Sequence, residues 1–181
     1  AGTGRLTRLL TPYAAKIYAF DISAHMLETA QGLLVPSVEL AVGDNRHMPV
    51  RDHVAHITLA GWSFGHAVAW SPDAWRAEIG LMLAEMARIT QPEGVQIIIE
   101  TLGTGQAEPH APNDQLATFY DWLEAEHGFT RTWLRTDYRF ESVAQAEQLM
   151  RFFFNDALAE HVIQADALTL PECTGIWWRR G

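Results

Sequence analysis

The sequence contains a single cysteine, Cys173, so no disulfide can form within the chain and nothing in it requires an oxidising compartment. No apolar run approaches the ~20 residues that a membrane-spanning helix needs, and no signal peptide is recognisable. These absences predict a cytoplasmic protein that does not act at a membrane.

Basic residues are also scarce. Lys and Arg number 13 against 22 Asp and Glu, which gives a formal net charge of −9. A protein this acidic is poorly suited to non-specific binding of a phosphate backbone, so nucleic acid is not an expected partner. The eight histidines show no metal-ligand spacing, and we predict no metal. Nothing in the sequence indicates an oligomeric state.

The 181 residues, 48% of them hydrophobic, suffice for one domain with a sizeable core. Short apolar segments alternate with segments whose apolar residues recur every three or four positions, a pattern that predicts strands alternating with helices. The predicted strands cover residues 16–21, 38–43, 56–60 and 95–101. The predicted helices cover 5–10, 23–34 and 72–90, the last with Ser71 as N-cap, Pro72 in its first turn, and a buried face of Trp75, Ile79, Met82, Met86 and Ile89. This alternation predicts a parallel sheet with helices on both faces.

The last third of the chain has a different order. A helix is predicted over 114–127, ending near Gly128, and a strand over 130–140. Ser142 and Gln145 form a capping-box pattern that predicts a helix from 142 to about 160. The final strand, 175–179, is predicted to pair antiparallel with 130–140.

The chain opens with a glycine turn, Gly2-Thr3-Gly4, that leads directly into a helix. Such a turn normally follows a strand, and a layered sheet without that strand would expose ladder groups at its centre. We therefore expect the first strand of the sheet to be missing from this chain, which would make it a fragment of a longer domain.

Three polar elements fall where predicted strands end or helices begin. The glycine turn allows close backbone approach to a ligand. Asp21 follows it at about the 20-residue spacing at which a carboxylate can accept from the ribose hydroxyls of a nucleoside. Asp44 and Asn45 end the next strand. Each has a simpler interpretation, as a turn or a helix cap, but their shared placement at one sheet edge favours a nucleoside site.

The segments that carry these elements resemble successive motifs of small-molecule class I S-adenosylmethionine-dependent methyltransferases. They are Ala1-Gly2-Thr3-Gly4-Arg5, residues 19–27 with Asp21-Ile22-Ser23, residues 43–49, His56 to Trp62, and Gln91-Pro92-Glu93-Gly94. The resemblance implies a Rossmann-like, mostly parallel sheet with an antiparallel C-terminal strand, one cofactor-binding domain over 1–181, and S-adenosylmethionine as cofactor.

The resemblance also implies roles for individual residues. Gly2, Thr3 and Gly4 would line the methionine part of the cofactor, and Asp21 would hold the ribose. The remaining contacts would come from Ile22 and Met26 against the adenine, Asp44 and Asn45 at its edge, and Gly61 and Trp62 near the sulfonium.

Two other functions remain open at this point. A nicotinamide-dependent oxidoreductase also has a glycine turn and an acidic second strand, but its fingerprint asks for glycine or alanine where this chain has Thr7. A cofactor-binding protein without catalysis would share every motif above.

Methyl transfer from a sulfonium requires mainly alignment of donor and acceptor, so no universal catalytic residue is expected. His66 follows the fourth predicted strand and is our candidate for a general base, with a structural loop histidine as the alternative. Aromatic residues in the same region, including Trp62 and Trp70, favour a small organic methyl acceptor. Its identity cannot be read from the sequence.

Overall fold

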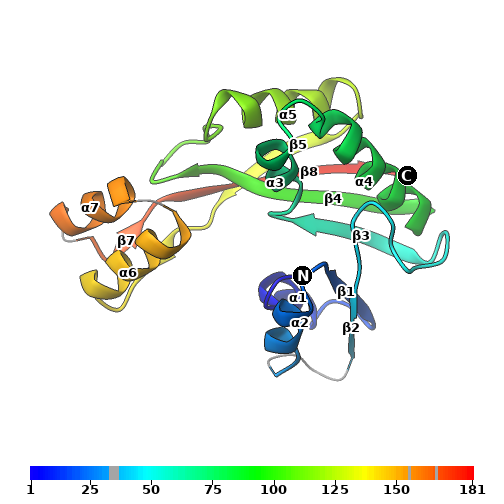
Figure 1. Ribbon diagram of the computed structural model, residues 1–181, viewed down its shortest axis with the longest axis horizontal. Coiled ribbons are helices and arrows are strands. Elements are labelled where there is room, and N and C mark those ends of the chain that lie inside the picture. Colours follow the sequence, from blue (N-terminus) through cyan, green and yellow to red (C-terminus); the bar gives the residue numbers. More distant parts are fainter. Residues whose placement is uncertain (33–36, 155, 166) are drawn as a thin grey trace. The chain divides into compact units, whose positions relative to one another are not determined.

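The computed structural model describes residues 1–32, 37–154, 156–165 and 167–181. The chain forms two compact units, the first made of 1–96 with 180–181 and the second of 97–179 (Figure 1). Strand β4 (Thr90–Thr104) and strand β8 (Glu172–Arg180) each run from one unit into the other. The expectation of a single cofactor-binding domain stays a prediction.

The first unit begins with the glycine turn and two parallel strands. Helix α1 (Arg5–Leu10) is followed by β1 (Ile17–Asp21), α2 (Ala24–Gln31) and β2 (Val38–Val42), with Asp21 paired to Val42 at the strand ends. The Ser23 hydroxyl accepts from the Met26 N–H and caps α2. These elements confirm the sequence prediction, although the predicted end of the second helix at Leu34 lies outside the described residues.

The next part of the first unit corrects one boundary. Strand β3 (Ala55–Gly61) lies where it was predicted, but a helix that was not predicted, α3 (Phe64–Trp70), comes before α4 (Trp75–Ile89). Ser71 was predicted to start the long helix and instead ends α3, because its N–H donates to the Ala67 carbonyl at 3.0 Å. Ala74 is the true N-cap of α4.

The buried face of α4 is close to the predicted one. It consists of Trp75, Ile79, Leu83, Met86 and Ile89, so Leu83 takes the place expected for Met82. The following strand, β4, begins at Thr90 rather than at Val95, because Pro92, Glu93 and Gly94 are part of it. Gly94 permits this extension: a Cβ atom there would lie only 2.8 Å from the His56 carbonyl oxygen of the neighbouring strand β3.

The second unit contains the rest of β4, then α5 (Asp114–Ala125), β5 (Thr130–Arg135) and most of β8, in the sheet order β4-β8-β5. Strand β5 is antiparallel to β8, with Thr130 opposite Trp178 and Arg135 opposite Cys173, which confirms the predicted antiparallel C-terminal strand. Its core includes the aromatic residues Phe119, Tyr120 and Trp177.

Two predictions for the region between β5 and β8 are wrong in detail. The strand predicted over 130–140 is interrupted, since β6 (Tyr138–Arg139) pairs with β7 (Thr169–Leu170) in a separate small sheet. The helix predicted from 142 to about 160 is two helices, α6 (Val143–Phe153) and α7 (Asp156–Gln164), which pack together beside that sheet (Figure 1).

This helical pair has a core and an ionic link of its own. Ser142 caps α6 as expected, accepting from the Gln145 N–H at 3.1 Å. Arg151 donates to Asp156 and Glu160 of α7, both at 2.6 Å. The buried residues of the cluster are Phe140, Ala146, Met150, Ala159, Val162 and Leu170. The fold as a whole is the predicted mixed α/β class.

Candidate cofactor-binding site

The glycine turn lies directly against the end of β1. The Gly2 N–H donates to Asp21 Oδ2 at 2.7 Å, and the Gly4 N–H closes the turn on the Ala1 carbonyl at 3.0 Å. Gly2 (φ 54°) and Gly4 (φ 84°) both adopt the left-handed backbone conformation that glycine tolerates best. The first two elements predicted from the sequence therefore meet.

The Asp21 carboxylate stands at the carboxyl end of β1 and is held from two sides. Its Oδ1 accepts from the Ser23 N–H at 2.9 Å, while Oδ2 faces the glycine turn. Partial burial alone would raise the pKa of this carboxyl, but the backbone N–H groups of Ser23 and Gly2 outweigh it and the pKa is lowered. Asp21 is therefore ionised at neutral pH, and as a carboxylate it can accept several hydrogen bonds at once.

Apolar side chains lie next to this carboxylate in the chain and remain in water. Ile22 is 68% exposed and Met26, in the first turn of α2, is 43% exposed. Large apolar side chains with this much exposed area beside an ionised acceptor suit a flat, apolar ring with polar substituents, as a purine nucleoside has.

The third predicted element lies beside the second. The Gly43 N–H donates to the Asp21 carbonyl at 3.1 Å, and a Cβ atom at Gly43 would come within 3.2 Å of Phe20 Cδ1. Asp44 and the half-buried Asn45 follow at once. The ends of β1 and β2 thus place both predicted carboxylates along one edge.

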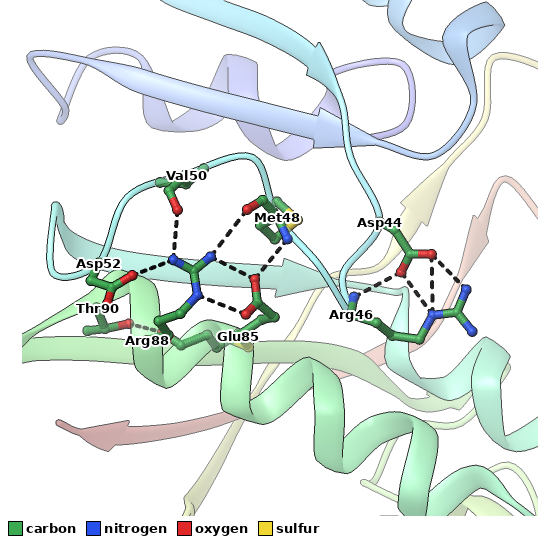
Figure 2. A network of polar contacts seen from close by, with 9 residues as sticks. Asp44, Arg46, Met48, Val50, Asp52, Glu85, Arg88 and Thr90 are labelled. Atoms are coloured by element: carbon green, nitrogen blue, oxygen red, sulfur yellow. Dashed lines mark hydrogen bonds and ion pairs between the residues drawn. The ribbon is translucent and has the colours of Figure 1, made fainter.

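Asp44 has a partner that the sequence analysis missed. Its Oδ1 accepts from the Arg46 backbone N–H at 2.9 Å and its Oδ2 from Arg46 Nη2 at 2.6 Å, which lowers the pKa of the Asp44 carboxyl (Figure 2). Arg46 also donates to Glu78 of α4 at 2.7 Å. The only sequence signal for this contact is the two-residue spacing of Asp44 and Arg46. That spacing suits a turn in which the aspartate side chain accepts from the backbone, but it does not predict Glu78 as a second acceptor for Arg46.

The end of β3 meets the helix that follows the glycine turn. A Cβ atom at Gly61 would overlap the Leu6 side chain of α1, so glycine allows α1 to pack closely here. The Arg5 guanidinium lies over the Trp62 ring, 5.1 Å from its centroid. Trp62 itself has φ 46°, a conformation that costs energy for a large side chain and is often found at functional sites.

His66 lies in the unpredicted helix α3, on its exposed side. Its ring stacks on Trp70 with centroids 5.2 Å apart, so its ring partner is not one of the predicted cofactor residues. Within the described residues, no three His, Cys, Asp or Glu side chains cluster as metal ligands would. None of the helices in the described part of the chain is long and apolar enough to cross a bilayer.

Comparison with known families decides between the functions left open. Residues 1–98 match the family described as "Methyltransferase domain". The chain belongs to this family. The matched segment contains all the predicted site residues, from Gly2 to His66. The protein is a methyltransferase, and S-adenosylmethionine is its cofactor. Thr7, which is 6% exposed in α1, also occupies the position where a nicotinamide fingerprint requires a smaller residue.

Solved structures support the fold of this methyltransferase. A candidate type II methyltransferase from Anaeromyxobacter dehalogenans aligns with a TM-score of 0.65 at 16% identity, covering 99% of this chain and 86% of its own. An S-adenosylmethionine-dependent methyltransferase from Aquifex aeolicus aligns with a TM-score of 0.57 at 15% identity, covering 98% and 77%. No curated protein sequence gives a significant match.

Proposed function

We propose that this methyltransferase binds S-adenosylmethionine along the carboxyl ends of β1, β2 and β3 and transfers the methyl group to a small organic acceptor. The observation that carries the proposal is the contact of the glycine turn with Asp21, together with the Gly43–Asp21 backbone hydrogen bond beside it. These contacts gather the three expected cofactor elements within the first unit.

Each element then has a defined task in this proposal. Asp21, ionised and held by two backbone N–H groups, accepts from the ribose hydroxyls. The exposed side chains of Ile22 and Met26 pack against the adenine face, and Asp44 and Asn45 address its edge.

The remaining elements serve the methionine end and the acceptor. Gly2, Thr3 and Gly4 line the methionine part, where the glycine backbone permits close approach. Gly61 and Trp62 lie toward the sulfonium, on the segment that packs against α1.

The reaction needs little covalent help from the protein. The bound cofactor supplies an activated methyl group, and the chain's residues align donor and acceptor and receive any proton released. We assign proton removal to His66, whose exposed ring is accessible to an acceptor. The exposed Trp70 beside it supports an acceptor with an apolar or aromatic part. A cytoplasmic location without nucleic-acid or membrane partners belongs to the same proposal.

The test is calorimetric titration of the purified protein with S-adenosylhomocysteine and, separately, with NADH. We expect binding of the first and none of the second. Transfer of a labelled methyl group from S-adenosylmethionine to a panel of small amines, phenols and carboxylic acids then identifies the acceptor class. Binding of NADH alone would contradict the proposal, and binding of S-adenosylhomocysteine without methyl transfer to any member of the panel would contradict the small organic acceptor.

A further inference from the structure

Helix α4 carries charged residues that hold the segment between β2 and β3. We name residues 44–52 the adenine loop, since under the proposed function it carries Asp44 and Asn45. Figure 2 shows the adenine loop running past α4, with the Arg88 guanidinium pointing from the helix into the curve of the loop. The inference below rests on the proposed function.

Arg88 binds the backbone of the adenine loop as well as the side chain of Asp52. Nη1 donates to the Val50 carbonyl at 2.8 Å and Nη2 to the Met48 carbonyl at 3.2 Å. Nη1 also donates to Asp52 at 2.6 Å. A planar guanidinium with several fixed donors can satisfy carbonyls on two residues at once, so its position determines the path of the loop.

Glu85 binds both Arg88 and the backbone of the adenine loop. Its carboxylate accepts from Arg88 Nε at 2.8 Å and from Nη2 at 2.7 Å, and its Oε2 also accepts from the Met48 N–H at 2.8 Å. The Glu85 side chain is 14% exposed, and its hydrogen bonds with Arg88 lower its pKa to about 2. Both Met48 backbone groups are therefore bound to α4.

The start of the adenine loop is tied to the same helix. Arg46 donates to Glu78 of α4 and simultaneously to the Asp44 carboxylate. Asp44 is thus oriented through Arg46, while Met48 and Val50 are oriented through Arg88. The loop is thus attached to one helix at two places, at Arg46 and at Met48 with Val50, and both follow Asn45 in the chain.

We propose that Arg88 is a positioning residue for adenine recognition: with Glu85, it holds the adenine loop in the path that presents Asp44 and Asn45 to the cofactor's base. The Arg88 side chain binds the loop and Glu85. Its effect is on discrimination between bases, because a carboxylate acceptor favours a base that carries an amino group over one that carries a carbonyl.

The readout is the ratio of dissociation constants for S-adenosylhomocysteine and for S-inosylhomocysteine, in which a carbonyl replaces the adenine amino group. We expect the wild-type protein to prefer the adenine form by about tenfold or more, the loss expected for a mismatched hydrogen bond. Arg88→Ala should bring this ratio close to one. Arg88→Lys should restore it only in part, because an ammonium lacks the guanidinium fork. Glu85→Gln should lower the ratio in the same direction and serves as the variant if Arg88→Ala does not fold.

Arg151→Ala is the matched control. Like Arg88, Arg151 binds several acidic side chains, here Glu147, Asp156 and Glu160, but it lies in the α6–α7 pair of the second unit. Its loss should lower thermal stability and leave the base preference at the wild-type value.

The outcomes separate the two proposals. Wild-type protein that binds neither compound removes the proposed function and this inference with it. If it binds S-adenosylhomocysteine with no base preference, or if folded Arg88→Ala keeps the full preference, the inference alone is overturned. An equal loss of affinity for both compounds would also overturn the inference, because it would assign Arg88 a purely structural role.

Discussion

Removing the Asp21 carboxylate is the most direct test of the site. In the structure this side chain accepts from the Gly2 N–H at 2.7 Å and from the Ser23 N–H at 2.9 Å. In the proposed complex it also accepts from both ribose hydroxyls. Asp21→Ala therefore removes the ribose acceptor and loosens the glycine turn at the same time.

The magnitude follows from the charge and exposure of the group. A hydrogen bond to a charged partner contributes roughly 1.5–3 kcal/mol. The Asp21 side chain is 21% exposed, so the low end applies, and two lost ribose bonds correspond to about a 100-fold rise in the dissociation constant. Because the pKa of Asp21 is lowered, its stabilising hydrogen bonds are present above the usual carboxyl pKa of 3.8 and are lost as the pH falls below it. Cofactor affinity should therefore be constant from pH 8 to about pH 5.

The assay is titration with S-adenosylhomocysteine, paired with thermal unfolding to verify that the variant is folded. Asp137→Ala is a matched control, because Asp137 accepts from the Glu172 N–H at 3.2 Å and pairs with Arg135 in the second unit. It should lower stability without changing cofactor affinity. A folded Asp21→Ala protein that binds S-adenosylhomocysteine as tightly as wild type would refute the reasoning and remove Asp21 from the site.

Three further predictions use other parts of the first unit. Gly94→Ala should destabilise the fold by about 1–3 kcal/mol, because its Cβ would lie 2.8 Å from the His56 carbonyl oxygen. Gly80→Ala, with open space around it in α4, should instead stabilise the fold by about 0.5–1 kcal/mol. Urea unfolding measures both changes. His66→Ala should lower kcat by about 100-fold at unchanged KM for S-adenosylmethionine, and full turnover would contradict a base role. The pKa of Glu85 is about 2 against its usual 4.5, so the ionised carboxylate stabilises the fold above pH 4.5, and this stabilisation is lost as the pH falls from 4.5 toward 2. Glu85→Gln should therefore make the free energy of unfolding depend less on pH over that range, as followed by circular dichroism.

The elements that could be predicted from the sequence are those with complete local signals. Helix α1 begins after a glycine that can adopt a left-handed conformation and was predicted with its observed bounds, Arg5–Leu10. Helix α6 begins directly after its N-cap Ser142, where the serine hydroxyl accepts from the Gln145 N–H and the Gln145 side chain accepts from the Glu141 N–H. Such signals act locally and do not depend on how the rest of the chain packs.

The wrong boundary at Ser71 shows where local signals fail. Serine followed by proline marks the start of a helix, but proline is also common just after a helix ends. Here the second interpretation holds, since Ser71 closes α3 and α4 starts at Trp75. Only the packing of the short helix α3, through Phe64 and Val68, distinguishes the two, and no local sequence signal reveals that packing.

The candidate site also contains both residues that could be predicted from the sequence and residues that could not. Asp21 and Asp44 could be named because Asp21 ends β1 and Asp44 closely follows the end of β2, and parallel strands bring their ends to one edge. The contact between Arg88 and the loop could not be predicted, because Arg88 lies some 40 residues along the chain from the carbonyls it binds. The local signal for Arg88 is the Glu85–Arg88 pair at a spacing of three, which is common on helices and says nothing about a distant loop.

The pairing of Asp44 with Arg46 is compatible with adenine recognition by the same carboxylate. Three Arg46 donors, the backbone N–H, Nε and Nη2, make four contacts with the carboxylate, because Nε is shared between Oδ1 at 3.0 Å and Oδ2 at 3.3 Å. In the proposed complex the adenine amino group would take the place of the longer Nε contact. The pairing also keeps Asp44 ionised and fixed before any ligand arrives, so less side-chain entropy is lost on binding than for a free aspartate. Under the proposed function, helix α4, which binds Arg46 through Glu78, would contribute to cofactor affinity by orienting Asp44.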